Sequence, residues 1–198
     1  NMTFTDTHCH LADPKLADTL PAVLADAQAA GVARFIVPAT SPKDWQAVAQ
    51  LERPSENTHI ALGIHPWFSD GLNEAAFQEL ESELIRHPQA WVGEIGLDFY
   101  GKEQTQAQRN TQTDVFIRQL ILAQNLNRRV IIHNLKATAA IAAAVKTAGF
   151  TRGGIVHAFS GSVEEARILV NLGFKIGIGS LLLNPNAKKV RVALQALN

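Results

Sequence analysis

The sequence predicts an α/β protein, specifically a (βα)8 TIM barrel whose eighth βα unit is missing from this chain. Three observations support this prediction. Short apolar runs rich in Val and Ile recur along the chain, each is followed by a stretch with helical spacing, and polar residues stand where the runs end. With 198 residues, 46% of them apolar and 18% charged, the chain can form a packed core and is not disordered. We therefore expect one barrel domain over residues 1–198, incomplete at its C-terminus.

Seven apolar runs have the character of β-strands. They are short and lack the polar alternation of a half-exposed strand, which is typical of strands buried on both faces of a parallel sheet. In chain order they are Phe4–His8, Arg34–Pro38, His59–Gly63, Trp91–Glu94, Arg129–His133, Gly154–His157 and Phe174–Ile178.

The segments between these runs have the spacing of amphipathic helices. In the first of them, apolar residues fall on one stripe and Gly31 follows as a stop signal. The predicted helices span Leu16–Ala30, Ala75–Arg86, Thr113–Gln124, Ala137–Ala148 and Val163–Leu172. A strand followed by a helix in this way is the βα unit of a parallel sheet.

Strict alternation of strands and helices allows two architectures, a (βα)8 barrel and an open doubly wound sheet. The open sheet usually has a glycine-rich phosphate loop after its first strand, whereas this chain has the polar cluster Thr7–His10 there. Polar residues at the ends of many strands favour the barrel, because barrel active sites lie at that end. Such barrels contain about 250 residues, so we expect an eighth strand in addition to the seven found.

Composition predicts a soluble, cytoplasmic protein. No apolar run approaches the ~18–20 residues that cross a bilayer, and no secretory signal opens the chain. The only cysteine, Cys9, cannot form an intrachain disulfide. We expect no membrane association, and the sequence implies no obligate protein partner.

Acidic and basic residues balance at 18 each, so the whole chain lacks the excess of positive charge typical of nucleic-acid-binding proteins. The balance is uneven along the chain. Residues 1–127 contain 16 acids and 8 bases, whereas residues 128–198 contain 2 acids and 10 bases. Either the two parts neutralise each other in the fold, or the basic part forms a wall for a phosphate-bearing substrate.

His8 and His10 stand two positions apart at the end of the first predicted strand. The period of two puts both side chains on the same side of the strand, whereas Cys9 points the other way. Two such histidines can bind one divalent ion, although the pair alone also fits an ordinary hydrogen-bonded arrangement.

Further candidate ligands follow other strands. Glu94, His133 and His157 directly follow the apolar runs of the fourth, fifth and sixth strands. In a barrel these strand ends converge on one mouth. A buried carboxylate is costly without a partner, and a divalent cation is one partner that removes this cost. The convergence therefore predicts a metal centre.

Four other polar residues have less certain roles. His65 follows the third strand and is a candidate substrate contact, a residue behind the ligands, or a loop histidine turned by the next proline. Asp98 is either a carboxylate that orients a ligand histidine or a turn residue. His59 and His87 stand at the opposite strand ends, so we expect them to be structural.

Glu94 and the histidines at the predicted mouth exceed the usual three protein ligands of one catalytic zinc ion. A natural division is two divalent cations bridged by Glu94. Paired ions activate water and stabilise the entering and leaving oxygens, which suits hydrolysis of phosphodiesters. The sequence does not select among Mg, Mn and Zn.

Five motifs stand in order along the chain: Thr5–His10, Gly63–Pro66, Gly93–Asp98, Val130–His133 and His157–Gly161. Together they resemble the TatD family of metal-dependent deoxyribonucleases, within the amidohydrolase-like barrels. The resemblance implies a (βα)8 barrel with two divalent cations that hydrolyses ester bonds in DNA, commonly with Mg²⁺ and from the 3′ end. It implies the metal ligands His8, His10, Glu94, His133 and His157. We expect Glu94 to bridge one ion held by the first two histidines and another held by the last two.

The sequence departs from the family pattern in two places. After the fifth-strand histidine the family usually has a small polar residue and then an arginine, whereas Leu135 stands in the arginine's place here, followed by Lys136. The family also has an acidic ligand on the eighth strand, and residues 158–198 contain no Asp. The first departure removes a natural phosphate contact, for which Lys136 is a candidate substitute.

Three hypotheses about function remain open. The favoured one is a metal-dependent deoxyribonuclease with DNA as its substrate. The second is a hydrolase of small amides or esters on the same barrel, because a fold alone does not determine the substrate. The third is a catalytically inactive metal-binding homologue, and a truncated chain would itself be inactive.

Overall fold

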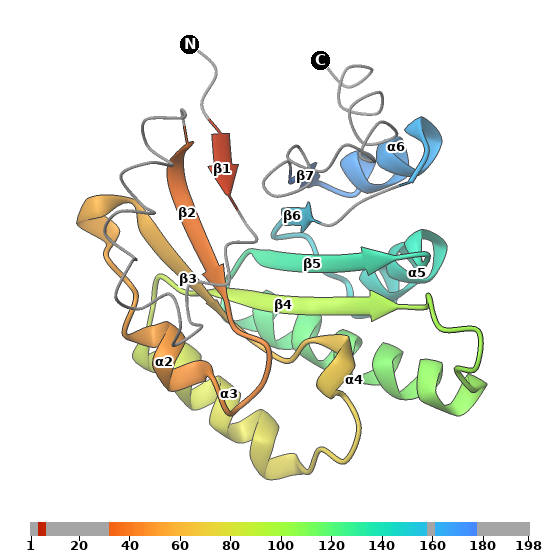
Figure 1. The fold of residues 1–198 in the computed structure, drawn as a ribbon, viewed down its shortest axis with the longest axis horizontal. Helices are drawn as coiled ribbons and strands as arrows, with labels where there is room; N and C mark the ends of the chain where they lie inside the picture. Colours follow the sequence, from red (N-terminus) through yellow and green to blue (C-terminus); the bar gives the residue numbers. More distant parts are fainter. Residues whose placement is uncertain (1–3, 7–31, 158–160, 178–198) are drawn as a thin grey trace.

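The computed structural model describes residues 4–6, 32–157 and 161–177. Their strands form one seven-stranded sheet whose order follows the chain, and all neighbouring strands are parallel (Figure 1). The strands are β1 (Phe4–Asp6), β2 (Val32–Pro38), β3 (Thr58–Leu62), β4 (Trp91–Asp98), β5 (Val130–Leu135), β6 (Gly154–His157) and β7 (Phe174–Ile176). This is the pairing expected of consecutive βα units.

Helices alternate with the strands from β2 onward. They are α2 (Trp45–Ala49), α3 (Glu74–Arg86), α4 (Gln106–Asn125), α5 (Thr138–Ala148) and α6 (Val163–Asn171), with short 3-10 helices η2 (Pro54–Glu56) and η3 (Pro66–Phe68). In Figure 1, α2, α3 and α4 lie below the sheet, and α5 and α6 lie at its right. Among the described helices, none is long and apolar enough to cross a membrane.

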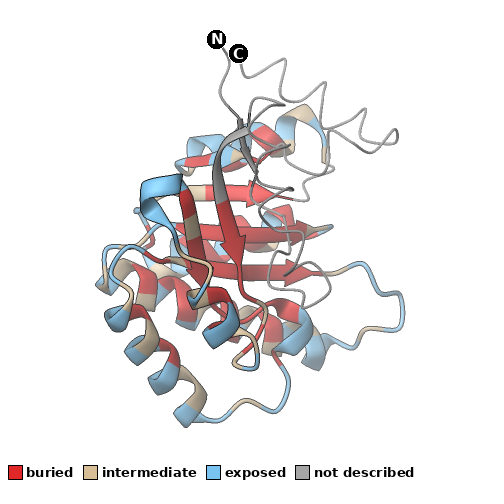
Figure 2. Ribbon diagram, turned by 60° about the vertical axis from the view of Figure 1, so that its left-hand side comes forward, coloured by how far each residue is buried: buried red, intermediate tan, exposed pale blue. Residues whose placement is uncertain are grey.

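The main apolar core lies between these helices and one face of the sheet. It joins strand residues such as Leu62, Val92 and Ile132 to helix residues such as Leu84 and Phe116. Figure 2 shows buried strands and helices that alternate between buried and exposed faces. Removal of this apolar surface from water is the main stabilising contribution to such a fold.

The opposite face of the sheet has a smaller apolar cluster. It consists of Ile36, Ala61, Ile131 and Ile155, with Trp91 packed against it. Side chains alternate along a strand, so residues two positions after Ile131 and Ile155 extend from this same face. Those residues are His133 and His157, so the candidate site lies on this face of the sheet.

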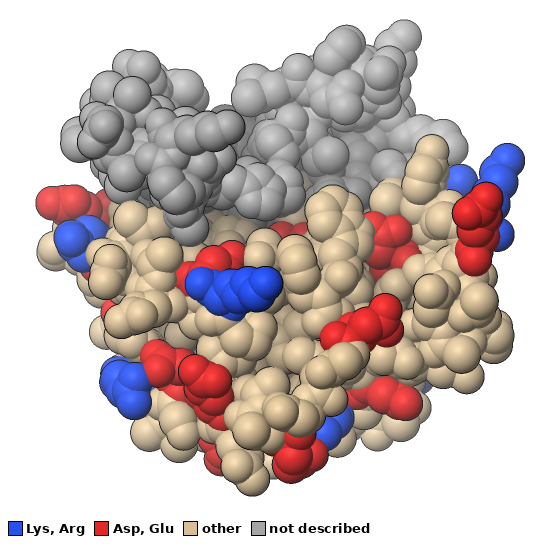
Figure 3. Space-filling model, turned by 60° about the horizontal axis from the view of Figure 1, so that its bottom comes forward, with Lys and Arg blue, Asp and Glu red and all other residues tan. Residues whose placement is uncertain are grey.

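The charges on the helix-covered side are mixed in sign. In Figure 3, Lys and Arg side chains lie in small groups among Asp, Glu and uncharged residues. Arg118 of α4 and Glu74 of α3 form an ion pair between these helices. The described surface in this view has no continuous basic stripe of the kind that binds a nucleic-acid backbone.

The predicted alternation of strands and helices is confirmed, and the structure corrects two boundaries. β4 continues to Asp98, so Glu94 lies inside the strand and not at its end, where the sequence placed it. α4 begins at Gln106 and not at Thr113, because Thr105 and Gln108 form a capping box. The structure also adds α2, which the sequence did not predict.

Two other expectations fall beyond what the structure describes. The predicted helix over residues 16–30 lies outside the described residues. Within the described part, β1 and β7 stand at the two ends of the strand order. The eighth βα unit stays a prediction.

Candidate metal centre

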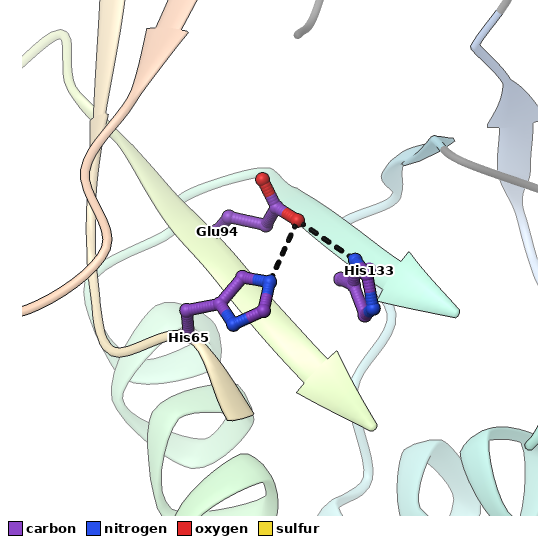
Figure 4. A group of neighbouring side chains, drawn as sticks. All are labelled: His65, Glu94 and His133. Carbon is purple, nitrogen blue, oxygen red and sulfur yellow. Dashed lines mark ion pairs between the residues drawn. The ribbon is translucent and has the colours of Figure 1, made fainter. Parts of the chain in front are cut away.

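Glu94 stands at the centre of a group of histidines. Its side chain is 1% exposed. Its Oε1 atom lies 3.2 Å from Nε2 of His65 and 3.0 Å from Nδ1 of His133 (Figure 4). Its Oε2 atom lies 2.8 Å from Nε2 of His157. A buried carboxylate therefore faces three imidazoles, which come from the loop after β3, from β5 and from β6.

A shift in strand register directs the side chain of Glu94 to the face of the sheet that carries His133. The pairing of β4 with β5 shifts between Val92 and Ile95. Both of these residues pack in the main core on the helix side, although they stand an odd number of positions apart. Glu94 lies between them and faces the opposite side, where His133 extends.

Gly96 allows β4 and β5 to approach at this point. It is paired with His133 and has a φ of +136°, and a Cβ atom built there would stand 2.1 Å from the carbonyl oxygen of His133. Only glycine fits a position with this backbone conformation and this contact. The glycine thus brings the backbone of His133 close to the strand that carries Glu94 and Asp98.

His65 reaches Glu94 from the loop after β3. It is the N-cap of η3, and Pro66 occupies the first position of that short helix. The backbone N–H of His65 donates to the carbonyl oxygen of Thr40 at 2.8 Å, and its Nδ1 accepts from the backbone N–H of Trp67 at 3.1 Å. These two hydrogen bonds orient the ring so that Nε2 faces the carboxylate.

Two buried glutamines of α4 hold the backbone next to the centre. The Oε1 atom of Gln119 accepts from the N–H of Ile64 at 2.8 Å, and its Nε2 donates to the carbonyl of Ile64 at 3.1 Å. Gln112 makes the same pair of bonds with the backbone of Asp98, at 2.9 and 3.2 Å. Because each amide satisfies both backbone groups of one residue, α4 fixes the backbone beside His65 and at Asp98.

Asp98 lies behind the ring of His133. Its Oδ2 atom is 3.1 Å from Nε2 of His133 and accepts from Nε1 of Trp67 at 2.8 Å. Its Oδ1 atom accepts from the backbone N–H of Tyr100 at 3.2 Å. Asp98 therefore performs both roles that the sequence left open, because it orients a histidine and also holds a turn.

The pKa values of Glu94 and the nearby histidines indicate which of these side chains are charged. Burial alone would raise the pKa of Glu94, but His157, His133 and His65 outweigh burial and hold this pKa well below its usual range. Burial lowers the pKa of His65. Burial acts in the same direction on His133, but Glu94 and Asp98 outweigh it and raise the pKa of this histidine. Glu94 is thus ionised at neutral pH, and His65 is neutral.

The ring nitrogens of His65 and His133 have different roles. Nδ1 of His65 accepts a hydrogen bond, so its neutral ring carries the proton on Nε2, which donates to Glu94. For His133, Nε2 faces the carboxylate of Asp98 and Nδ1 faces Glu94. Each carboxylate accepts a hydrogen bond, so both ring nitrogens of His133 carry protons, as its raised pKa indicates, and a cation bound at Glu94 would replace the Nδ1 proton.

The donor set fits a divalent cation. One ligand atom each from His65, Glu94 and His133 lies within 4.8 Å of the others. His157 adds a further buried imidazole on the other carboxylate oxygen. Imidazole nitrogens with a carboxylate are ligands that zinc and other transition metals take in proteins.

The structure brings together Glu94, His133 and His157, as the sequence predicted, together with His65. The predicted ligands His8 and His10 lie outside the described residues. Sequence reasoning missed three residues, namely Trp67, Gln112 and Gln119. The two glutamines stand seven positions apart on one side of a helix, a spacing that could have indicated them, but glutamine is usually a surface residue.

The parallel α/β fold and the buried His–Glu cluster are those of a metal-dependent hydrolase, as the following comparisons show. The family model described as TatD related DNase matches residues 5–198. The chain belongs to the TatD family, as the sequence motifs predicted.

Relatives of known structure agree with this assignment. The Escherichia coli protein described as an uncharacterized metal-dependent hydrolase, YjjV, is 35% identical over 196 residues, which cover 98% of this chain and 74% of that relative. The crystal structure of this TatD homologue matches with a TM-score of 0.84 over 96% of this chain and 73% of that one. Solved TatD structures are TIM barrels, which confirms the predicted fold class.

Two further proteins are similar to this chain. A zebrafish protein described as putative deoxyribonuclease tatdn3 is 29% identical over 181 residues, which cover 86% of this chain and 67% of that relative. A TatD family hydrolase from Entamoeba histolytica has a TM-score of 0.75 at 22% identity, over 89% of this chain and 65% of that one, and supports the fold alone.

Proposed function

We propose that this protein is a metal-dependent deoxyribonuclease that hydrolyses phosphodiester bonds in DNA. The observation that carries the proposal is the ionised, buried carboxylate of Glu94 among His65, His133 and His157. The description of the family as TatD related DNase and the zebrafish relative's description as a putative deoxyribonuclease support DNA as the substrate. The reaction class is ester hydrolysis.

In this proposal the site would hold two divalent cations. His8 and His10 would bind one ion, His133 and His157 the other, and Glu94 both. Oε1 of Glu94 faces His133 and Oε2 faces His157, so the carboxylate already lies next to both histidines of the second ion. When bound, such ions activate water and stabilise the charge that develops on the phosphate oxygens.

The residues of this chain have separate tasks. Asp98 orients His133, and the capped loop orients His65. His65 has a proton on Nε2 and lies at the edge of the group, so it can donate a hydrogen bond to a substrate oxygen, in line with its predicted role as a substrate contact. Metal binding to Glu94 would release this donor from the carboxylate.

A cavity at the C-terminal end of β5 can take the rest of the substrate. Its volume is about 640 Å³, and its lining includes Phe99, Asn134, Lys136, Thr138 and Ser162. Asn134 and Lys136 lie just after His133 along the chain, so the cavity lies at the end of the strand that carries this proposed ligand. Lys136 supplies a positive charge for a phosphate, in the place of the family's arginine.

A nuclease assay tests the proposal directly. Single-stranded DNA labelled at either end is incubated with the protein and Mg²⁺ or Mn²⁺. We expect shortening from the 3′ end, abolition by a chelator and recovery when metal is added back. Glu94→Gln should lose at least about 100-fold in rate, whereas Glu79→Gln, an exposed carboxylate on α3, should retain full activity.

A second candidate, hydrolysis of small esters or amides, is favoured by one observation. Leu135 stands where the family usually has an arginine, so one natural phosphate contact is missing. The two candidates differ in substrate and not in fold or metal. Turnover of small esters without any cleavage of DNA under the same metal conditions would support the second candidate and contradict the first.

A further inference from the structure

Trp67 is a large aromatic side chain that faces solvent beside the metal centre. It is 70% exposed, the highest value among the large hydrophobic residues that the structure describes. Its ring centroid lies 4.7 Å from that of His65 and 6.2 Å from that of His133. A single exposed apolar residue is common on protein surfaces, so exposure alone implies no ligand.

This ring is also held in a fixed position. Its Nε1 donates to Oδ2 of Asp98 at 2.8 Å, and its backbone N–H donates to Nδ1 of His65 at 3.1 Å. The first bond restricts the rotamers of the side chain and the second fixes the backbone that carries it, so the ring loses freedom before any ligand binds, which lowers the entropic cost of a later contact. The anchors leave most of the ring surface free for such a contact.

Tyr100 is a second exposed aromatic residue, and its backbone contacts the same carboxylate. It is 63% exposed, and its backbone N–H donates to Oδ1 of Asp98 at 3.2 Å. Nζ of Lys136 lies 4.9 Å from the centroid of its ring. An aromatic face and a positive charge therefore stand together, and the same lysine lines the cavity at the C-terminal end of β5.

Asp98 connects these features to the metal centre. One carboxylate contacts the ring of Trp67, the backbone of Tyr100 and the ring of His133. The ring of Trp67 and the backbone that carries Tyr100 are thus both attached to the residue that orients a proposed metal ligand. A group that rests on Trp67 lies next to the imidazoles of His65 and His133.

We propose that Trp67 and Tyr100 form a stacking platform for the nucleobases of a single-stranded nucleic acid whose phosphodiester lies at the metal centre, with Lys136 on the neighbouring phosphate. This inference rests on the proposed function and specifies which part of the substrate is recognised. The bases of a single strand expose their faces, whereas those of a duplex stack on each other. Base–aromatic stacking is tolerant of sequence, so the platform would bind without base preference.

Binding of two matched oligonucleotides tests the platform. One is a fluorescein-labelled oligothymidine, and the other has abasic sites at its terminal positions. Both have terminal phosphorothioate linkages that resist hydrolysis, and binding is measured by fluorescence anisotropy with Mg²⁺. We expect wild-type protein to prefer the base-containing strand by about 5- to 150-fold, the range of one stacked base.

Substitutions of the aromatic residues test whether the preference for the base-containing strand depends on their rings. Trp67→Ala should weaken binding of the base-containing strand about tenfold or more and leave binding of the abasic strand nearly unchanged. Trp67→Phe keeps a ring and should retain part of the preference, and Tyr100→Ala should lose part of it. Phe68→Ala removes the next exposed aromatic residue of the same turn and serves as the matched control, with the wild-type preference retained.

The results of the binding assay and of the cleavage assay test the stacking platform and the proposed nuclease activity separately. Equal binding of both strands by the wild type, or an equal loss for both strands in Trp67→Ala, overturns the platform even if DNA is cleaved. A preference for bases that Trp67→Ala removes supports the platform, whatever the cleavage assay gives. Failure of unmodified DNA to be cleaved counts against the nuclease activity alone.

Discussion

Oδ2 of Asp98 lies 3.1 Å from Nε2 of His133, on the side of the imidazole opposite Glu94. Because a carboxylate accepts hydrogen bonds, this contact places a ring proton on Nε2 and directs Nδ1 toward Glu94. The orientation of a proposed metal ligand therefore depends on a residue that is not itself a proposed ligand.

Replacement of this carboxylate should weaken metal binding. In Asp98→Asn, the side chain keeps its size but loses the negative charge that orients His133 and holds Trp67. We expect a fall of about 10- to 100-fold in metal affinity, measured by isothermal titration with Mn²⁺. Asp114→Asn, an exposed position on α4, is the control. Equal metal affinity of the two variants would show that Asp98 has no influence on the ligand.

Metal binding should stabilise the folded protein through Glu94. At a metal concentration about 100 times the dissociation constant, a ligand that binds only the native state adds about 2.7 kcal/mol to the free energy of unfolding. We expect Mn²⁺ to raise the melting temperature of the wild type and of Glu79→Gln, but not that of Glu94→Gln. A rise of the same size in Glu94→Gln would exclude this carboxylate as the bridging ligand.

The contact between Gly96 and His133 should tolerate no side chain. Gly96→Ala places a Cβ atom 2.1 Å from a backbone oxygen at a φ of +136°, so one of the two strands must move. We expect a loss of at least about 2 kcal/mol in the free energy of unfolding, measured by urea denaturation. Gly149→Ala has a φ of +62° but no neighbour within 4 Å, and should cost about 1 kcal/mol. A smaller loss at Gly96 than at Gly149 would contradict the clash.

The hydrogen bonds of Gln119 should matter for both stability and the site. Gln119→Leu leaves the N–H and the carbonyl of Ile64 buried without their side-chain partner, at a cost of about 1–3 kcal/mol for each group. Because Ile64 precedes His65, we also expect weaker binding of substrate, seen as a raised KM. Gln78→Leu, at an exposed position on α3, should change neither quantity. A stability loss with an unchanged KM would limit Gln119 to a structural role.

The sequence predicted most of the strands because each is a compact apolar run between turn signals. The two histidines of β5 and β6 could be singled out for the same reason, since each directly follows an apolar run. His157 does end β6, whereas His133 and Glu94 lie inside strands that continue to Leu135 and Asp98, so their predicted positions at strand ends are wrong. Gly93 and Gly96 interrupt the apolar pattern of β4, so the sequence looked as if the strand ended, whereas the glycines allow a close approach of β5.

Other parts of the site could not be predicted from the local sequence. The capping box at Thr105 extends α4 into a polar segment that has no apolar stripe. Gln112 and Gln119 are buried only because backbone groups from β4 and from the loop after β3 meet them. The ring of Trp67 beside Asp98 depends on a contact between residues 31 positions apart. Such contacts arise from the packing of distant segments and not from local periodicity.

The two glutamines of α4 fix the number of helical residues that can stand between them. They stand seven residues apart, which is about two helical turns and roughly 10.5 Å along the axis. One inserted or deleted residue between them would rotate one amide by about 100° relative to the other, and one of the two backbone attachments would be lost. Insertions are therefore expected to accumulate in the exposed turns at the ends of α4, while the segment between the glutamines keeps a constant number of residues.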